Sequence, residues 1–268
     1  MPTATANGID LNYVESGAGE HTVVFSHGLL LDHHMFEPQR LALSEQYRVI
    51  AYDHRGQGES APAAGGYDMD SLTEDAVDLI RGTQSVPCHF VGLSMGGFVG
   101  MRLAARYPEL VRSLTLLNTS ASPETLLARI RFRAMQAVTS LFGPGPLINQ
   151  VLPVMFGHSF RNDPERRPQL ERWMHHVQSL PRRIVGPVGG VIGRAGVVDE
   201  LKFIRCPTLV LTGDEDQTTL PAEAERIAAQ IAGSKLVRLA GCGHTSTIEA
   251  PDAVTAAIRQ FLAEVDAT

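Results

Sequence analysis

The sequence predicts an α/β protein with a mostly parallel sheet of eight strands, flanked by helices and interrupted by a helical insertion. Apolar, strand-like runs alternate with helical patterns over most of the 268 residues, and this alternation is typical of a parallel sheet covered on both faces. One long segment contains helical patterns only. Hydrophobic residues make up 44% of the chain and charged residues 19%, a composition typical of globular proteins rather than disordered ones.

The predicted strands follow one another from the N-terminus. An Asn-Gly pair lies between extended runs in TANGIDLNYVES and is a strong hairpin signal, so antiparallel strands are expected first. Buried strands are predicted in TVVFSHG, YRVIAYDHRG and CHFVGLS, with helices near residues 35–43 and 68–81 between them. The helix in GGFVGMRLAARYP is expected to end before Pro108. The strands VRSLTLLN, PTLVLTGDED and SKLVRLAGCGH complete the sheet.

The insertion divides the chain into a core, residues 1–121 and 201–268, and a helical cap, residues 122–200, which we call the lid. In ETLLARIRFRAMQAVTSLF, apolar residues at positions 127, 130, 134, 138 and 141 recur at helical spacing. The lid carries ten Arg, no Lys and six acidic residues, a balance of +4 against −10 for the core. Charged runs ordinarily mark solvated helix faces. The alternative is a lid that attracts anions through Arg129, Arg133 or Arg172.

Charge, termini and cysteines exclude several classes of function. The net charge of −6 gives no overall attraction to nucleic acids or anionic membranes, so neither is expected as a partner. The N-terminal MPTATANGID has no secretory signal pattern, and no apolar run is long enough to span a bilayer. Cys88, Cys206 and Cys242 are odd in number and widely spaced, which favours reduced thiols. A cytoplasmic location is therefore expected.

The candidate chemistry begins at Gly92-Leu93-Ser94-Met95-Gly96, a G-x-S-x-G pattern between a predicted strand and a predicted helix. In that context the serine occupies a strained turn that exposes its hydroxyl at the carboxyl end of the sheet. The bare pattern occurs by chance in about one of ten chains of this length. The interpretation of Ser94 as a nucleophile therefore depends on the predicted strand before the pattern and the predicted helix after it. The alternative is an ordinary turn in which the serine caps the helix.

A serine nucleophile needs a base and a group that orients the base. The expected chain order is serine, acid, histidine, and LTGDEDQ and AGCGHTS, which each follow a late strand, place Asp216 and His244 in these positions. Asp214 is the alternative acid. Two carboxylates alone do not complete a metal coordination shell, so no metal site is expected. The other candidate histidines precede the acid: His27, His33, His34, His54, His175 and His176.

With these motifs in place, the chain resembles the α/β-hydrolase superfamily over essentially its whole length. The resemblance lies in SHGLLLDHHMF, YDHRGQGES, GLSMGG, GDEDQTTLP and GCGHTSTIEAP, and it implies an α/β-hydrolase fold. In this superfamily the acid commonly stands three residues after the glycine of its loop, here Gly213, which selects Asp216. The resemblance also implies an oxyanion hole formed by the backbone N–H groups of Leu29 and Met95. Asp53 and Arg55 are interpreted as pairing within the fold.

The predicted function is hydrolysis of small carboxylic esters by Ser94 through an acyl-enzyme, without a cofactor or metal. A serine in place of aspartate argues against haloalkane dehalogenases and epoxide hydrolases, and the chain looks most like small bacterial carboxylesterases and 3-oxoadipate enol-lactonases. A lactonase is the alternative, followed by a C–C bond hydrolase, a perhydrolase and a slow-turnover receptor. The pocket is expected to be compact and apolar, with Leu30 and Trp173 contacting substrate and further side chains from Leu29, Leu31, Met135, Phe142, Met155 and Phe156.

Overall fold

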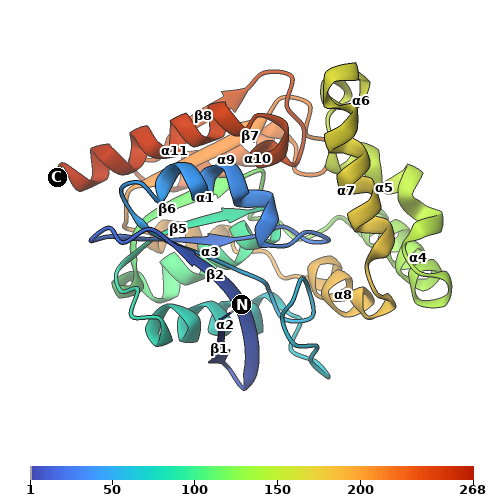
Figure 1. The fold of residues 1–268 in the computed structure, drawn as a ribbon, viewed down its shortest axis with the longest axis horizontal. Helices are drawn as coiled ribbons and strands as arrows, with labels where there is room; N and C mark the ends of the chain where they lie inside the picture. The colour runs from blue at the N-terminus through green and yellow to red at the C-terminus, as the bar shows by residue number, and fades with distance from the viewer. Residues whose placement is uncertain (1) are drawn as a thin grey trace.

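The computed structural model of the protein describes residues 2–268. Its eight strands form a single sheet in the order β1-β2-β4-β3-β5-β6-β7-β8 (Figure 1). Only the β1–β2 and β2–β4 pairs are antiparallel, and Ala6 pairs with Ile9 across the Asn-Gly turn, so the predicted hairpin and mostly parallel sheet are confirmed. The strands are β1 (Thr3–Ala6), β2 (Ile9–Ser16), β3 (Thr22–Ser26), β4 (Arg48–Tyr52), β5 (Cys88–Leu93), β6 (Val111–Leu117), β7 (Thr208–Gly213) and β8 (Lys235–Leu239).

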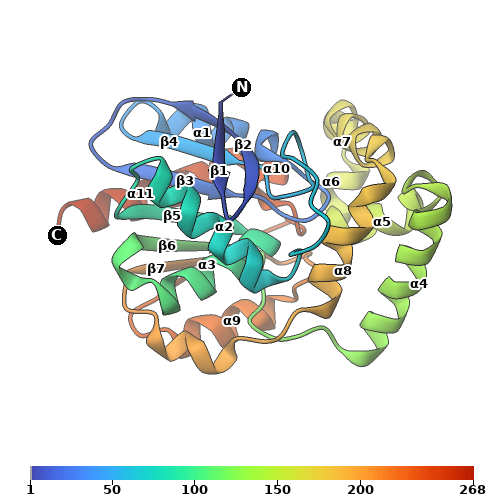
Figure 2. The same ribbon diagram turned by 90° about the horizontal axis from the view of Figure 1, so that it is seen from below.

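Helices cover both faces of the sheet, as Figure 2 shows. One face carries α2 (Met69–Gly82), α3 (Met95–Arg106) and α9 (Pro221–Gln230), and the other carries α1 (Glu37–Leu43) and α11 (Pro251–Asp266). Side chains of β3 alternate between the two hydrophobic clusters, since Val24 packs with the first set and Val23 and Phe25 with the second. This period of two is what a strand buried on both faces requires.

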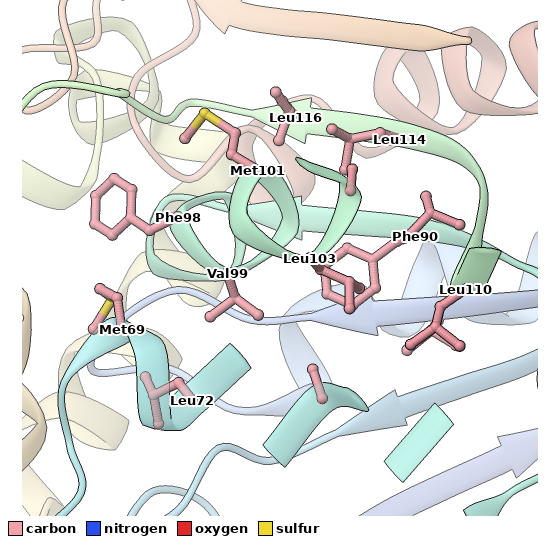
Figure 3. Packing of buried hydrophobic residues seen from close by; sticks show 14 of the residues in the cluster. Met69, Leu72, Phe90, Phe98, Val99, Met101, Leu103, Leu110, Leu114 and Leu116 are labelled. Carbon is pink, nitrogen blue, oxygen red and sulfur yellow. The ribbon is translucent and has the colours of Figure 1, made fainter. Parts of the chain in front are cut away.

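The core beneath α3 fixes the position of the helix that follows Ser94. Figure 3 shows Phe98, Val99 and Met101 of α3 packed among side chains of α2, β5 and β6. Each fully buried apolar side chain of this size contributes about 1.5–3 kcal/mol of transfer free energy. A Cβ added at Gly100 would lie 3.1 Å from Phe90 and Leu114, so helix and sheet approach closely here. The packing of β5 and α3 thus fixes the position of the turn at Ser94, which joins them.

Five α-helices lie between β6 and β7, within the segment that we call the lid. Figures 1 and 2 both show them gathered at one end of the sheet, and no strand occurs between β6 and β7 in the described structure. A short helix, α10, precedes α11 in the core. The bounds are α4 (Leu126–Phe142), α5 (Ile148–Met155), α6 (His158–Asn162), α7 (Arg167–Ser179), α8 (Val185–Gly193) and α10 (Ser246–Glu249). Across residues 2–268, no helix is both long and apolar enough to cross a membrane.

Helix α4 is apolar on two faces. The residues whose spacing predicts the helix point outward, since Leu127 is 78%, Ile130 60% and Leu141 63% exposed. A second set, which includes Phe132 and Met135, lines a cavity on the inner side. The periodicity therefore identified a helix correctly, but the apolar stripe it identified is not the face that packs inward.

Candidate active site

Ser94 occupies a strained turn between β5 and α3. Its backbone lies at φ 52° and ψ −109°, a region that non-glycine residues rarely adopt. The flanking glycines are required because a Cβ at Gly96 would lie 1.9 Å from the carbonyl oxygen of Ser26, and a Cβ at Gly92 would lie 2.2 Å from that of Gly96. The Ser94 N–H donates to the Leu117 carbonyl at 2.9 Å. The turn is therefore fixed by close backbone packing, and its serine lines a cavity.

His244 is held by a buried carboxylate. Its Nδ1 lies 2.9 Å from Asp216 Oδ2, so the proton is assigned to Nδ1 and Nε2 keeps its lone pair. Asp216 Oδ1 accepts from the N–H groups of Thr218 at 2.8 Å and Thr219 at 3.0 Å. Burial alone would raise the pKa of Asp216, but the His244 charge and these hydrogen bonds lower it to about 2. Asp216 is therefore a carboxylate near neutral pH.

The structure brings Ser94 and His244 to the wall of one cavity. Within residues 2–268, hydrogen bonds join His244 to Asp216, whereas none joins His244 to Ser94. Catalytic hydrogen bonds are often long in the unliganded state and shorten when substrate binds. The three predicted residues thus lie at one place in the fold. The hydrogen bond between His244 and Asp216 is formed, and the one between His244 and Ser94 is not.

Asp214 lies elsewhere. Its side chain is exposed, and its Oδ1 accepts from the Gly241 N–H at 2.8 Å. This hydrogen bond links the residue that follows β7 to the loop that follows β8. The geometry therefore separates the two aspartates, because only Asp216 contacts the imidazole of His244.

Sequence reasoning missed Asn118, which follows β6 directly. Its Nδ2 donates to Asp216 Oδ2 at 2.9 Å and to the Gly243 carbonyl at 3.0 Å. Asn118 therefore joins the acid loop to the histidine loop. Its position supplied a signal, since the carboxyl ends of parallel strands meet at one edge of a sheet. Thr219 was also missed, and its hydroxyl lies 2.8 Å from Asp216 Oδ2.

The resemblance places an oxyanion hole at two backbone N–H groups, those of Met95 and Leu29. Met95 is the first residue of α3, so its N–H has no acceptor within the helix. Leu29 lies in a turn in which the N–H of Leu30 donates to Gln57 and that of Leu31 donates to Gly28. Among residues 2–268 the N–H of Leu29 has no such acceptor. Leu29 also lines the cavity with Ser94.

The cavity has a volume of about 160 Å³, and most of its wall is apolar. Its polar lining residues include Ser94, His244 and Glu124, while arginine and lysine are absent from the lining residues. Glu124 accepts from Arg194 Nη1 at 2.7 Å. Most of the apolar wall comes from the lid, including Phe132, Met135, Val154, Met155, Val188 and Ile192.

Several residues proposed from the sequence lie outside this cavity. Leu29, Leu30, Met135 and Met155 line it, but Leu31, Phe142, Phe156 and Trp173 do not. Trp173 and Phe156 are buried in a hydrophobic cluster that joins lid and core, and Trp173 also borders a separate surface depression. Phe142 is 67% exposed. Large apolar lid residues serve the packing of the lid as well as the cavity, and their type alone does not separate the two roles.

The arginines proposed as anion partners also lie outside the cavity. Arg129 and Arg133 are exposed on α4. Arg172 borders the separate depression, and its guanidinium lies 4.0 Å from Glu37. These three arginines therefore do not line the cavity, whereas Arg194, a buried arginine of the lid, pairs with the lining residue Glu124.

The early histidines form an internal network beneath the turn at Leu29. His54 Nε2 lies 2.9 Å from the Ser26 hydroxyl, and the His54 N–H donates to His27 Nε2 at 2.9 Å. Burial lowers the pKa of both imidazoles, so both are neutral. His33 Nδ1 lies 2.9 Å from Asp53. Arg55 pairs with Asp75, so Asp53 and Arg55 are both engaged within the fold, although not with each other.

One group of residues in the described chain has the spacing of metal ligands: Asp32, His33 and His34. The two imidazole rings stack with centroids 4.0 Å apart and planes tilted by 31°. Nδ1 of His33 contacts Asp53, and Nδ1 of His34 contacts Asp32. Hydrogen bonds within the fold therefore account for this cluster.

A mostly parallel sheet that carries a serine on a strained strand-to-helix turn, beside a histidine held by a carboxylate, defines a hydrolase of the nucleophile-elbow class. The chain belongs to the alpha/beta hydrolase family, whose model matches residues 23–257. Its relatives are hydrolytic enzymes, and this protein is a hydrolytic enzyme of the same family.

Three relatives illustrate the similarity. The chain is 28% identical to 3-oxoadipate enol-lactonase 2 of Acinetobacter baylyi, over 97% of this chain and 96% of that protein. It is 31% identical to the enol-lactonase of Burkholderia xenovorans, with a TM-score of 0.89 over 98% of this chain and 100% of that one. It is 32% identical to a thermophilic esterase of Thermogutta terrifontis, with a TM-score of 0.90 over 98% of each chain.

Proposed function

We propose that this protein is a serine hydrolase that cleaves small, neutral carboxylic esters through an acyl-enzyme intermediate. The observation that carries the proposal is the cavity beside Ser94 and His244, whose wall is mostly apolar and whose lining residues include no arginine or lysine. The one acidic lining residue, Glu124, is already paired with Arg194. An apolar wall favours uncharged acyl and alcohol groups, because a charge buried there without a partner is costly. The similarity to an esterase and to enol-lactonases supports ester-type chemistry.

The proposed reaction begins when His244 Nε2 takes the proton of Ser94 Oγ as that oxygen attacks the ester carbonyl. The N–H groups of Leu29 and Met95 bind the resulting oxyanion, and each donor of this kind contributes about 3 kcal/mol. The carbon–oxygen bond to the alcohol then breaks, and His244 returns the proton to the leaving alcohol. Water, deprotonated by His244, releases the acid and restores Ser94. Asp216 remains ionised and orients the imidazole throughout.

A lactonase is the second candidate, favoured by the similarity to 3-oxoadipate enol-lactonases. A lactone formed from an adipate derivative retains one free carboxylate. Such a group would enter a cavity whose lining residues include no arginine or lysine to pair with it. We therefore place neutral esters and neutral lactones ahead of carboxylated ones, which reverses the preference suggested by the charge of the lid.

We expect kcat/KM to be highest for neutral esters with short to medium acyl chains and low for long-chain triglycerides. A carboxylated ester of matched size should be poorer by about tenfold, or about 1.4 kcal/mol, because burial removes the hydration of its carboxylate and no lining cation replaces it. The measurement is kcat/KM for p-nitrophenyl esters of increasing acyl length and for the p-nitrophenyl hemiester of succinic acid.

Arg133→Gln is the matched control for this series, since Arg133 is exposed outside the cavity and its loss should leave the discrimination unchanged. A preference for long chains would contradict the small-substrate proposal. A carboxylated ester that is the better substrate, with that advantage lost in Arg133→Gln, would restore the anion-attracting lid.

The pH dependence follows from the proposed roles. His244 must be neutral to accept the proton of Ser94, so the enzyme with a protonated imidazole should be inactive and activity should be lost in the acid range. Asp216, with a pKa of about 2, stays ionised over this range, so His244 is the only member of the triad that takes up a proton. A plot of log kcat/KM against pH should therefore fall with a slope of one while the protein stays folded. A rate that is flat into the acid range would argue against His244 as the base.

The cysteines support the expected cytoplasmic location, which we retain as part of the proposal. Cys88, Cys206 and Cys242 are unpaired. Burial raises the pKa of Cys88 to about 12 and that of Cys206 to about 11, so both are protonated near neutral pH. Protonated thiols are poor nucleophiles, and the proposed chemistry does not use them.

A further inference from the structure

A lid residue reaches the turn that carries Leu29. His176, on α7, has its Nε2 3.1 Å from the carbonyl oxygen of Leu30. Because a carbonyl only accepts, Nε2–H is the donor, and Nδ1 lies 3.8 Å from Asp32 Oδ2. The imidazole also packs edge-on against Trp173, with ring centroids 5.4 Å apart. His176 is thus held in place on the lid while its N–H reaches a backbone group of the core.

The backbone at Leu30 is in a conformation that leucine rarely adopts. Its φ is +67°, and the Leu31 N–H donates to the Gly28 carbonyl at 3.3 Å. Residues 28–31 therefore form a turn with positive φ at its third position, where glycine or asparagine is normally found. Leucine remains there only if its surroundings stabilise that conformation.

Both peptide groups that flank the Cα of Leu30 have partners. Its carbonyl accepts from His176, as described, and its N–H donates to Gln57 Oε1 at 3.1 Å. Gln57 Nε2 in turn lies 3.7 Å from the sulfur of Met95, the other residue of the proposed oxyanion hole. The two side chains therefore restrain the peptide groups on both sides of the Leu30 Cα.

The turn decides where the Leu29 N–H points. In a trans peptide the N–H and C=O groups point in opposite directions. The Gly28 carbonyl points into the turn, toward the Leu31 N–H, so the N–H of Leu29 in the same peptide points out of it. Keeping Leu30 at positive φ therefore keeps this donor aimed away from the turn.

We propose that His176, together with Gln57, is a positioning residue for the oxyanion hole, and that the lid thereby completes the catalytic site as well as covering it. The inference rests on the proposed serine-hydrolase function. A lid displaced from the core would leave the Leu30 carbonyl without its donor. Transition-state stabilisation would then depend on the position of α7.

The test uses the full chain with His176→Phe, which keeps a ring but removes the donor, and His176→Gln, whose amide nitrogen restores a donor at similar reach. His175→Phe is the matched control, because His175 is the exposed neighbour on the same helix. We expect His176→Phe to lower kcat about 10- to 100-fold with KM within about twofold. His176→Gln should recover most of the rate, and His175→Phe should match the wild type.

Two further readouts separate positioning from simple lid packing. Inhibition by a trifluoromethyl ketone, which forms a hemiketal oxyanion with the serine, should weaken in His176→Phe by about the factor lost in kcat. In a Leu30→Gly background, where positive φ is free of steric cost, the same substitution should cost less than about threefold.

The wild-type rate is read first and tests the proposed function alone, since a wild type that hydrolyses no ester contradicts that function. With an active wild type, His176→Phe at the wild-type kcat overturns the positioning role. A rise in KM with kcat unchanged, or an equal loss in His175→Phe, would also overturn it and assign His176 to lid packing.

Discussion

Ser94→Ala is expected to lower kcat by a factor on the order of 10⁴ to 10⁶ and to leave the fold intact. The hydroxyl is the proposed attacking group, whereas the turn itself is held by backbone contacts, including the bond from the Ser94 N–H to Leu117. Alanine can adopt the same backbone conformation at a similar steric cost. The measurement is the steady-state rate on the best ester, with circular dichroism and the thermal midpoint recorded for both proteins.

Ser246→Ala is the matched control. Ser246 is a buried serine two residues after His244 whose hydroxyl has no hydrogen-bond partner in the described structure, so its loss should change the rate little. A folded Ser94→Ala protein with a near wild-type rate would remove the nucleophile from the account.

The second large effect is expected at the acid. Asp216→Asn should lower kcat about 10⁴-fold, because an amide in place of the carboxylate no longer favours the imidazole with its proton on Nδ1 or stabilises its cation. The buried site also loses stability, by about 1–3 kcal/mol, since an amide NH₂ group would face donors such as Asn118 Nδ2. The thermal midpoint should therefore fall, and rates are to be compared well below it.

Asp214→Asn provides the comparison. Asp214 is exposed and accepts one hydrogen bond, from Gly241, which an asparagine oxygen can also accept. Its rate should stay within about threefold of the wild type. The reverse order, with Asp214→Asn the more damaging change, would reassign the acid.

The core of the fold could be predicted because its signals are local. The Asn7-Gly8 pair lies between the two strands that it joins, and the alternation of β3 between two hydrophobic clusters is visible in its own residues. The convergence of Ser94, Asp216 and His244 follows from one general rule, that loops after parallel strands share an edge. These features need no knowledge of distant contacts.

The lid could be predicted as helical but not as a binding surface. Periodicity identifies the apolar faces of α4, but it does not show which face lines the cavity and which is exposed to solvent. Both faces of this helix are apolar. Trp173 was expected in the cavity and lies instead in the cluster that joins lid and core. The same is true of the arginines. The net charge of the lid can be counted from the sequence, but it does not show which side of a helix carries the charged residues.

Contacts between distant segments had no signal in the sequence. His176 and Leu30 are separated by 146 positions, and nothing near either residue indicates the other. Gln57 lies within the YDHRGQGES motif, yet its bond to the Leu30 N–H depends on how two loops pack. Only the assembled structure shows that these side chains hold the turn beside Leu29.

The central claim is that Ser94 is the nucleophile of an acyl-transfer reaction, and covalent labelling tests it most directly. The wild-type protein is treated with diethyl p-nitrophenyl phosphate, which phosphorylates activated serines, and the modified peptide is located by mass spectrometry. We predict one diethylphosphoryl group per chain, on Ser94, with esterase activity lost in proportion to labelling. Labelling at another residue, or full labelling of Ser94 with activity retained, would contradict the claim.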